Sequence, residues 1–189
     1  LSRSGNPDAA LLACDRFLSQ LPGGERLLAA MRIHPDLVQL VARILATSPR
    51  LRDMIAQAPS LLDGLLDPAF FADVPSEKIL TQRLSELLKQ ARSEEDFLDL
   101  TRSFGREHLV LIGVRVISGA LSASRAGEAY ATLADVIIRE LHREVMRRFE
   151  ENHGRLAKQE TAVIALGKLG SREMTAGSDL DLILLYEFD

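Results

Sequence analysis

Two aspartates separated by a single residue, Asp179 and Asp181, are the strongest candidates for chemistry in this sequence. They open the apolar run 179–186, which has the length and composition of a β-strand. Alternate residues of a strand point to the same face, so we expect both carboxylates to project together while the neighbouring leucines enter a core. Like charges placed together resist burial, and a divalent cation such as Mg²⁺ resolves the conflict. The pair therefore predicts a metal site, with a solvated edge strand as the alternative.

The residues before the two acids add a candidate phosphate site. A second apolar run, 161–166, predicts a strand that stops at Gly167. Glycine allows a sharp turn, and the N–H groups of such a turn can face a phosphate. Lys168 follows, and a polar loop ends in Ser178 directly before the acids. Together these features predict phosphoryl or nucleotidyl transfer, a reaction that two metal ions would clamp in line.

This combination resembles the nucleotidyltransferase superfamily of the DNA polymerase β type. The pattern of that superfamily is an apolar residue, a glycine, a small residue, a loop and then Asp-x-Asp. Leu166 and Gly167 match its start, and the loop 169–178 leads to the two acids. Lys168 departs from the small second residue, and this departure points to one branch.

The branch is indicated by two strings around the loop. Gly-Lys-Leu-Gly-Ser-Arg-Glu-Met from Gly167, followed by Gly-Ser-Asp-Leu-Asp-Leu from Gly177, is similar to glutamine synthetase adenylyltransferases. Upstream, Ser-Pro-Arg-Leu from Ser48 and the leucine-rich string 59–68 resemble the helical region before the second catalytic half of these bifunctional enzymes. The resemblance covers most of the chain and favours the C-terminal, adenylylating half over the N-terminal, adenylyl-removing half.

The resemblance also implies roles for the site residues. Asp179 and Asp181 would hold two Mg²⁺ ions, while Gly167, Lys168 and Ser178 would line the phosphates of ATP. For Lys168, contact with the triphosphate and a position merely beside the turn are equally open. A third carboxylate, which activates the attacking hydroxyl, would lie on a later strand beyond the end of this chain. The chain by itself is therefore expected to be catalytically incomplete.

The implied reaction is the transfer of AMP from Mg-ATP to a tyrosine of glutamine synthetase, with release of pyrophosphate, as a control of nitrogen assimilation. Phosphorolytic removal of the same AMP group is the alternative within the family. A helical docking module without activity of its own, recognising glutamine synthetase or a PII-type nitrogen-signalling protein, is a further alternative. The last is a nucleotidyltransferase that acts on a small molecule or RNA.

Helices must occupy most of the chain before the two strands. All seven prolines fall at or before Pro75, so short helices with proline boundaries are expected first and long helices after them. Apolar periodicity predicts long helices over 76–90, 93–121 and 124–152. Ser93 and Asp96 resemble a capping box for the second, and its internal glycines, Gly105, Gly113 and Gly119, mark either close helix contacts or a break. Gly154 ends the third in the left-handed cap position.

The predicted fold class is therefore mainly α. An antiparallel helical domain over 1–155 leads into the first strands of a truncated polymerase-β-like α/β domain over 156–189. Arg172 and Glu173 are expected to form a surface ion pair, and the four histidines to occupy surface or cap positions. The charged residues of the third long helix predict a solvated, ion-paired face. Its buried stripe is expected to comprise Tyr130, Leu133, Ile137, Leu141, Val145 and Phe149.

Composition excludes several other classes. The 189 residues carry 23 Lys and Arg against 27 Asp and Glu, a net charge of −4, which argues against broad affinity for nucleic acid. No apolar run reaches the roughly 18 residues that span a bilayer, and no signal peptide is visible, so no membrane partner is expected. The single cysteine, Cys14, suits a reducing, cytoplasmic location.

Overall fold

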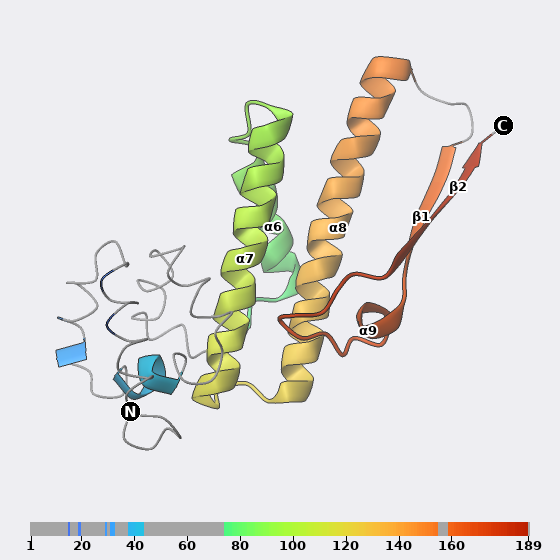
Figure 1. Cartoon of the computed structure of the whole chain (residues 1–189). Coiled ribbons are helices and arrows are strands. Elements are labelled where there is room, and N and C mark those ends of the chain that lie inside the picture. The colour runs from blue at the N-terminus through green and yellow to red at the C-terminus, as the bar shows by residue number, and fades with distance from the viewer. Residues whose placement is uncertain are drawn as a thin grey trace. The chain divides into compact units, whose positions relative to one another are not determined.

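The computed structural model describes residues 74–154 and 159–188 together with a few positions near the N-terminus (Figure 1). Those positions are 15, 19, 29, 31, 32 and 38–43. They are helical, and Leu40 and Val41 are buried. The other expectations for the first 73 residues, including the environment of Cys14, lie outside the described residues.

Contacts within the chain divide it into two compact units. The first comprises Leu1–Asp73 and Arg106–Ser122. The second comprises Val74–Gly105 and Ala123–Asp189, and it carries both aspartates of the candidate site.

Three long helices precede the strands, as the periodicity predicts. They are α6 (Glu77–Leu88), α7 (Glu94–Ser118) and α8 (Ala123–His153), and each end lies within one turn of its expected position. Gly154, with φ +81°, ends α8 in the predicted left-handed conformation. In the described part of the chain, no helix combines the length and the apolar character needed to cross a membrane.

The start of α7 is fixed by a side-chain cap. Ser93 Oγ accepts a hydrogen bond of 3.0 Å from the backbone N–H of Asp96, which confirms the first half of the predicted capping box. The Asp96 carboxylate reaches one residue further back than the motif requires and accepts from Arg92 N at 3.1 Å. The first four N–H groups of an α-helix have no partner within the helix, and the Ser93 bond satisfies that of Asp96, while the Asp96 carboxylate satisfies the N–H of Arg92 just before the helix.

Within the second unit, the first half of α7 runs antiparallel to α8. Glu94 lies 3.3 Å from Arg148, whereas a Cβ placed on Gly105 would lie 3.1 Å from Ile137 Cδ1. Positions that advance along α7 therefore meet positions that retreat along α8, as Figure 1 shows. Gly105 marks a close helix contact, and Gly119, with φ +83°, lies just after the end of α7. Of the two predicted roles for these glycines, a close helix contact is found at Gly105 and a helix break at Gly119.

The core of the second unit is made by α6, α7 and the first half of α8. Leu80 and Leu84 of α6 are buried, as are Phe97 and Phe104 of α7. In α8 the buried positions include Ala126, Tyr130, Ala131, Leu133, Ala134 and Val136. Most of these are apolar residues at helical spacing, so the period does identify the packed face.

The expected stripe of α8 is wrong in its second half. Val145 is 62% exposed and Phe149 is 41% exposed. For Phe149 the physical reason is the start of α7: Glu94, its first residue, already lies beside Arg148, so no turn of α7 remains beyond that point. Val145 is turned away from α7 because it lies about 100° around the helix from Glu144, which pairs with Arg148. Phe149 instead contacts the ring of His153 at a centroid distance of 4.8 Å.

The prediction of surface histidines also fails at one position. His108, in the part of α7 that belongs to the first unit, is 6% exposed. Val110, Ile112 and Val114 nearby are buried too, so this stretch of α7 is enclosed on more than one side. Histidine is usually found at least partly exposed, but His108 is buried because the surrounding segment of α7 is apolar and enclosed.

Two strands follow the helices and pair antiparallel. They are β1 (Gln159–Ala165) and β2 (Leu182–Phe188), in a register that places Ala165 opposite Leu182 and Gln159 opposite Phe188. A short helix, α9 (Gly167–Gly170), follows β1 directly. The expected start of the second strand is wrong: β2 begins at Leu182, so Asp179 and Asp181 lie in the segment that leads into it.

Candidate functional site

The two aspartates lie on the exposed approach to β2. Both side chains are solvent-exposed. The backbone of Asp181 is fixed, because its carbonyl accepts a hydrogen bond of 2.9 Å from Leu166 N, one position beyond the paired strands. Asp179 lies two residues earlier, outside any ladder, so the same-face geometry expected from strand alternation does not apply to the pair.

Gly167 and Asp181 are brought together, although they are distant in sequence. Gly167 has φ +52°, and a Cβ placed on it would lie 2.6 Å from Asp181 Oδ2. The carboxylate therefore rests against the glycine backbone at the point where the chain leaves β1. Glycine is required at this position for two reasons: the backbone is left-handed, and a side chain would collide with the Asp181 carboxylate.

Gly170 is a structural requirement of the same turn that sequence reasoning did not single out as a site residue. A Cβ on it would lie 2.7 Å from the carbonyl oxygen of Ala165, so α9 packs directly on the end of β1. Leu169 between the two glycines is 3% exposed and holds α9 on the core. The available signal was the spacing of Gly167 and Gly170, which places both on one side of a helical turn.

Ser178 closes a turn within the loop. Its Oγ accepts a hydrogen bond of 2.9 Å from Thr175 N, and its own N–H donates to Thr175 O at 3.1 Å. The two hydroxyl oxygens lie 3.0 Å apart. Ser178 therefore shapes the backbone immediately before Asp179.

Lys168 is exposed as the second residue of α9. Among the residues that the structure describes, its ammonium group makes no ion pair with either acid. Its charge faces water close to the Gly167 turn.

The expected ion pair between Arg172 and Glu173 is replaced by a longer-range contact. Arg172 lies 2.7 Å from Asp135 of α8, and Glu173 accepts a hydrogen bond from Ser171 Oγ at 3.0 Å. The loop is thus attached to α8 through its arginine.

The two acids suit a hard cation by their chemistry. Carboxylate oxygens are preferred ligands of Mg²⁺, and their exposure leaves room for the water that this ion retains. Over the described residues, no group of three or more His, Cys, Asp or Glu side chains is placed to hold a metal. The candidate centre therefore consists of two carboxylates, beside Gly167 and the Ser178 turn.

A cavity of about 230 Å³ lies behind the site, between α8 and the hairpin. His142 of α8 and Thr161 of β1 approach to 2.9 Å at its wall. Ala165, Leu169 and Leu182 also line it, so the backbone elements that position Gly167 and Asp181 border this space. The hydrogen bond fixes one end of the hairpin on α8.

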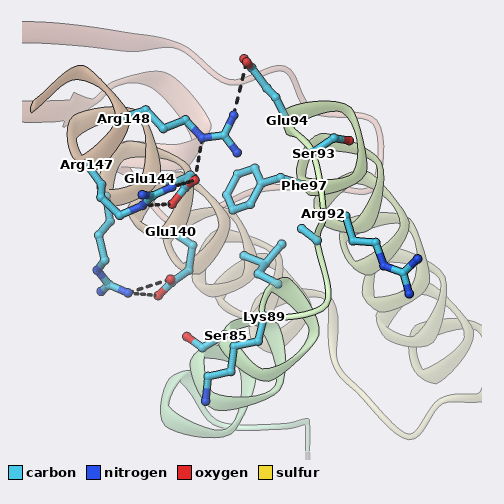
Figure 2. Close-up of a pocket in the computed structure, with 13 residues that line it drawn as sticks. Ser85, Lys89, Arg92, Ser93, Glu94, Phe97, Glu140, Glu144, Arg147 and Arg148 are labelled. Carbon is cyan, nitrogen blue, oxygen red and sulfur yellow. Dashed lines mark hydrogen bonds and ion pairs between the residues drawn. The ribbon is translucent and has the colours of Figure 1, made fainter. Parts of the chain in front are cut away.

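A larger concavity of about 560 Å³ lies where α6, α7 and α8 meet. Figure 2 shows Arg148 between Glu144 of its own helix and Glu94 of α7, with the ring of Phe97 alongside. Arg148 Cζ is 5.6 Å from the centre of that ring, within the range of a cation–π contact. A hydrogen bond from Arg147 lowers the pKa of Glu144 from 4.5 to about 2, and Arg148 adds to this effect.

These contacts confirm the ion-paired face predicted for α8. Arg143 contacts both oxygens of Glu140 at 2.7 Å, although Glu140 is buried rather than solvated. Arg147 also pairs with Glu151. The three acids of this concavity, Glu94, Glu140 and Glu144, are each paired with an arginine, so it has the character of a structural network.

Comparison with known proteins agrees with the motif. A family model described as glutamate-ammonia ligase adenylyltransferase matches residues 38–189. The whole chain is 61% identical to a bifunctional glutamine synthetase adenylyltransferase/adenylyl-removing enzyme of Xanthobacter autotrophicus, and 51% identical to one of Bradyrhizobium sp.. A relative of the same description in Rhodopseudomonas palustris is 48% identical.

The chain covers 19% of each of these proteins, so it spans about a fifth of the length of the curated relatives that it matches. The matched range includes the Gly167 turn and both aspartates. The chain therefore belongs to the glutamate-ammonia ligase adenylyltransferase family.

Proposed function

We propose that this chain forms part of an enzyme that transfers AMP from ATP to a tyrosine of glutamine synthetase. The observation that carries the proposal is the contact between Gly167 and Asp181, which places a carboxylate against the glycine turn at the end of β1. The names of the relatives supply the reaction and its protein substrate.

Asp179 and Asp181 would hold Mg²⁺, and Gly167, Lys168 and Ser178 would lie along the triphosphate. Bound metal would neutralise the charge that develops on the transferred phosphoryl group. The protein's share of the catalysis is then positioning: the Leu166–Asp181 hydrogen bond and the Ser178 turn hold the two acids on a fixed backbone.

The direction of the reaction is part of the proposal. The leucine-rich string before residue 68 favours the adenylylating half of the bifunctional enzyme, with phosphorolytic removal of AMP as the alternative. A domain boundary near residue 155, a cytoplasmic location and regulation through a PII-type protein belong to the same proposal. A third carboxylate outside this chain would complete the centre.

The test is the transfer of labelled AMP from Mg-ATP to purified glutamine synthetase by a full-length protein that contains this chain. Asp179→Asn and Asp181→Asn should each reduce labelling by at least about 100-fold, because metal-based charge stabilisation contributes several kcal/mol. Asp99→Asn is the matched control, since this acid forms an exposed pair with Arg102 on α7. The 189-residue chain alone should not label.

Each outcome separates the alternatives. Full labelling by the two Asn variants would refute the metal site. Absence of labelling by the unaltered full-length protein, together with phosphate-dependent release of AMP from adenylylated glutamine synthetase, would reverse the proposed direction. Binding of glutamine synthetase without either reaction would leave the docking module as the function.

A further inference from the structure

The loop that carries the candidate site is attached to α8 through one arginine side chain. Arg172 Nη1 lies 2.7 Å from Asp135 Oδ2, and Nη2 donates to Thr132 Oγ1 at 2.6 Å. Thr132 and Asp135 are three residues apart, so they lie on the same face of the helix. Both terminal nitrogens of the guanidinium group therefore bind side chains from a single turn of α8.

The backbone of Arg172 adopts a conformation that arginine does not favour. Its φ of +60° makes it the non-glycine residue with positive φ in the described part of the chain. Arg172 N donates to Leu169 O at 3.1 Å and Glu173 N to Lys168 O at 2.9 Å, so α9 ends with a left-handed cap of the kind that glycine usually supplies. An L-residue there costs about 1–2 kcal/mol, and a side chain with a task of its own explains why glycine is not used.

The loop backbone also packs on α8 without intervening side chains. A Cβ on Gly127 of α8 would lie 3.0 Å from Arg172 O and 3.2 Å from Glu173 Cα. Met174, the next residue, is 7% exposed. Side-chain pairing, close backbone contact and a buried methionine thus fix the same three residues of the loop.

This attachment divides the loop at a defined point. The two ends of the loop, Leu166 and Asp181, are joined by a backbone hydrogen bond. Between them, Arg172 binds Asp135 of α8. The segment between Arg172 and Asp181, which contains the Ser178 turn and Asp179, is held at both ends. Asp179 has no ladder of its own, so its position depends on these two attachments.

We propose that Arg172 is a positioning residue that, through Asp135 and Thr132, places Asp179 for metal binding. This inference rests on the proposed function of the two aspartates. Arg172 and Asp135 retain side-chain exposures of 44% and 30%, and exposed ion pairs contribute little to stability. The effect of breaking the pair should therefore appear in the site and only weakly in the free energy of unfolding.

Arg172→Gly separates the two effects. Glycine relieves the left-handed backbone and removes the contact with Asp135, so the melting temperature should stay the same or rise. In hydrogen exchange of the full-length protein without metal, amides of residues 173–178 should exchange about tenfold faster. Asp135→Asn should accelerate the same amides, and Arg172→Lys should restore part of the protection. Arg102→Ala, which breaks an exposed pair with Asp99 on α7, is the matched control and should change none of them.

The full-length protein supplies the second readout. For Arg172→Gly, the Mg²⁺ concentration giving half-maximal AMP transfer should rise about tenfold, while kcat at saturating Mg²⁺ and the KM for glutamine synthetase stay near their original values. The double variant Arg172→Gly/Asp135→Asn should require the same Mg²⁺ concentration for half-maximal transfer as Arg172→Gly alone. Both substitutions remove the same contact between Arg172 and Asp135, so their effects should not add.

Unchanged exchange of residues 173–178 in both Arg172→Gly and Asp135→Asn would overturn the inference, as would an unchanged Mg²⁺ dependence. These results differ from a failure of the proposed function, which would show as AMP transfer that persists in Asp181→Asn. Loss of loop protection with a tenfold shift in Mg²⁺ dependence supports the inference.

Discussion

Substituting Gly167 with alanine should damage metal binding far more than folding. The backbone at this position has φ +52°, and placing an L-residue in the left-handed region costs about 1–2 kcal/mol. For a chain of this size, each kcal/mol lowers the melting temperature by roughly 2–4 °C. The strain alone therefore predicts a fall of about 2–8 °C.

The new methyl group has a second effect, which is local. It would lie 2.6 Å from Asp181 Oδ2, so this oxygen must move by about 0.8 Å to reach ordinary contact at 3.4 Å. The atom is the end of a flexible side chain, and Asp181 Cγ, at 3.6 Å, is not crowded. The carboxylate turns aside at little cost in stability, yet metal ligands tolerate deviations of only about 0.2 Å.

Gly154→Ala is the matched control. Gly154 has φ +81°, and a Cβ there would meet nothing within 4 Å. Both variants should lose similar stability in thermal denaturation, whereas Gly167→Ala alone should weaken Mn²⁺ binding, measured by electron paramagnetic resonance on the full-length protein, by at least about tenfold. Equal Mn²⁺ affinity in the two variants would refute the reasoning that Asp181 binds metal from its place beside Gly167.

Three further predictions concern the elements that support the site. Ser93→Ala should lower the free energy of unfolding by about 1 kcal/mol in urea denaturation, because it removes the cap of α7. Ser76→Ala should lower it by clearly less, because the Ser76 side chain makes no cap hydrogen bond. Equal losses in the two variants would contradict the capping argument. The pKa of Glu144 is lowered from 4.5 to about 2 by its hydrogen bond from Arg147, so its ionised form stabilises the fold above pH 4.5 and this contribution is lost as the pH falls toward 2. Glu144→Gln should consequently be less stable than the original protein at pH 7, and the difference in melting temperature should shrink as the pH falls from 4.5 toward 2; a difference that stays constant over this range would contradict it. Thr161→Val removes the hydrogen bond between β1 and α8 and should speed hydrogen exchange of the hairpin amides several-fold, while exchange in α6 stays unchanged.

The sequence predicts features whose cause is local. The start of α7 follows from Ser93 and the end of α8 from Gly154, because caps act on backbone groups within one turn. The turn at Gly167 could also be predicted, because glycine stops the apolar run there, whereas its contact with Asp181 could not, since it depends on the pairing of β1 with β2. Their chemical roles stay predictions.

Features that depend on tertiary contacts could not be predicted in the same way. The pairing of Arg172 with Asp135 joins positions that are far apart in the sequence, and nothing local distinguishes Asp135 from Glu173 as its partner. Periodicity identifies the packed face of α8 but not the point at which α7 stops covering it, and it therefore wrongly predicts a buried Phe149. The sequence predicts a strand that begins at Asp179, because the alternation of acidic and apolar residues continues before Leu182, the first residue of the ladder.

The composition of β2 makes the hairpin a hazard in concentrated solution. Leu182, Ile183, Leu184, Leu185 and Tyr186 follow one another without a proline or a charge, and their exposures run from 40% to 69%. In the described residues, this sheet has two strands, so the outer backbone groups of β2 have no strand beside them. Short apolar segments with strong β propensity and an open edge template the addition of strands from other molecules. Wherever these five residues after Asp181 are left uncovered, aggregation competes with folding, and its rate must rise with protein concentration.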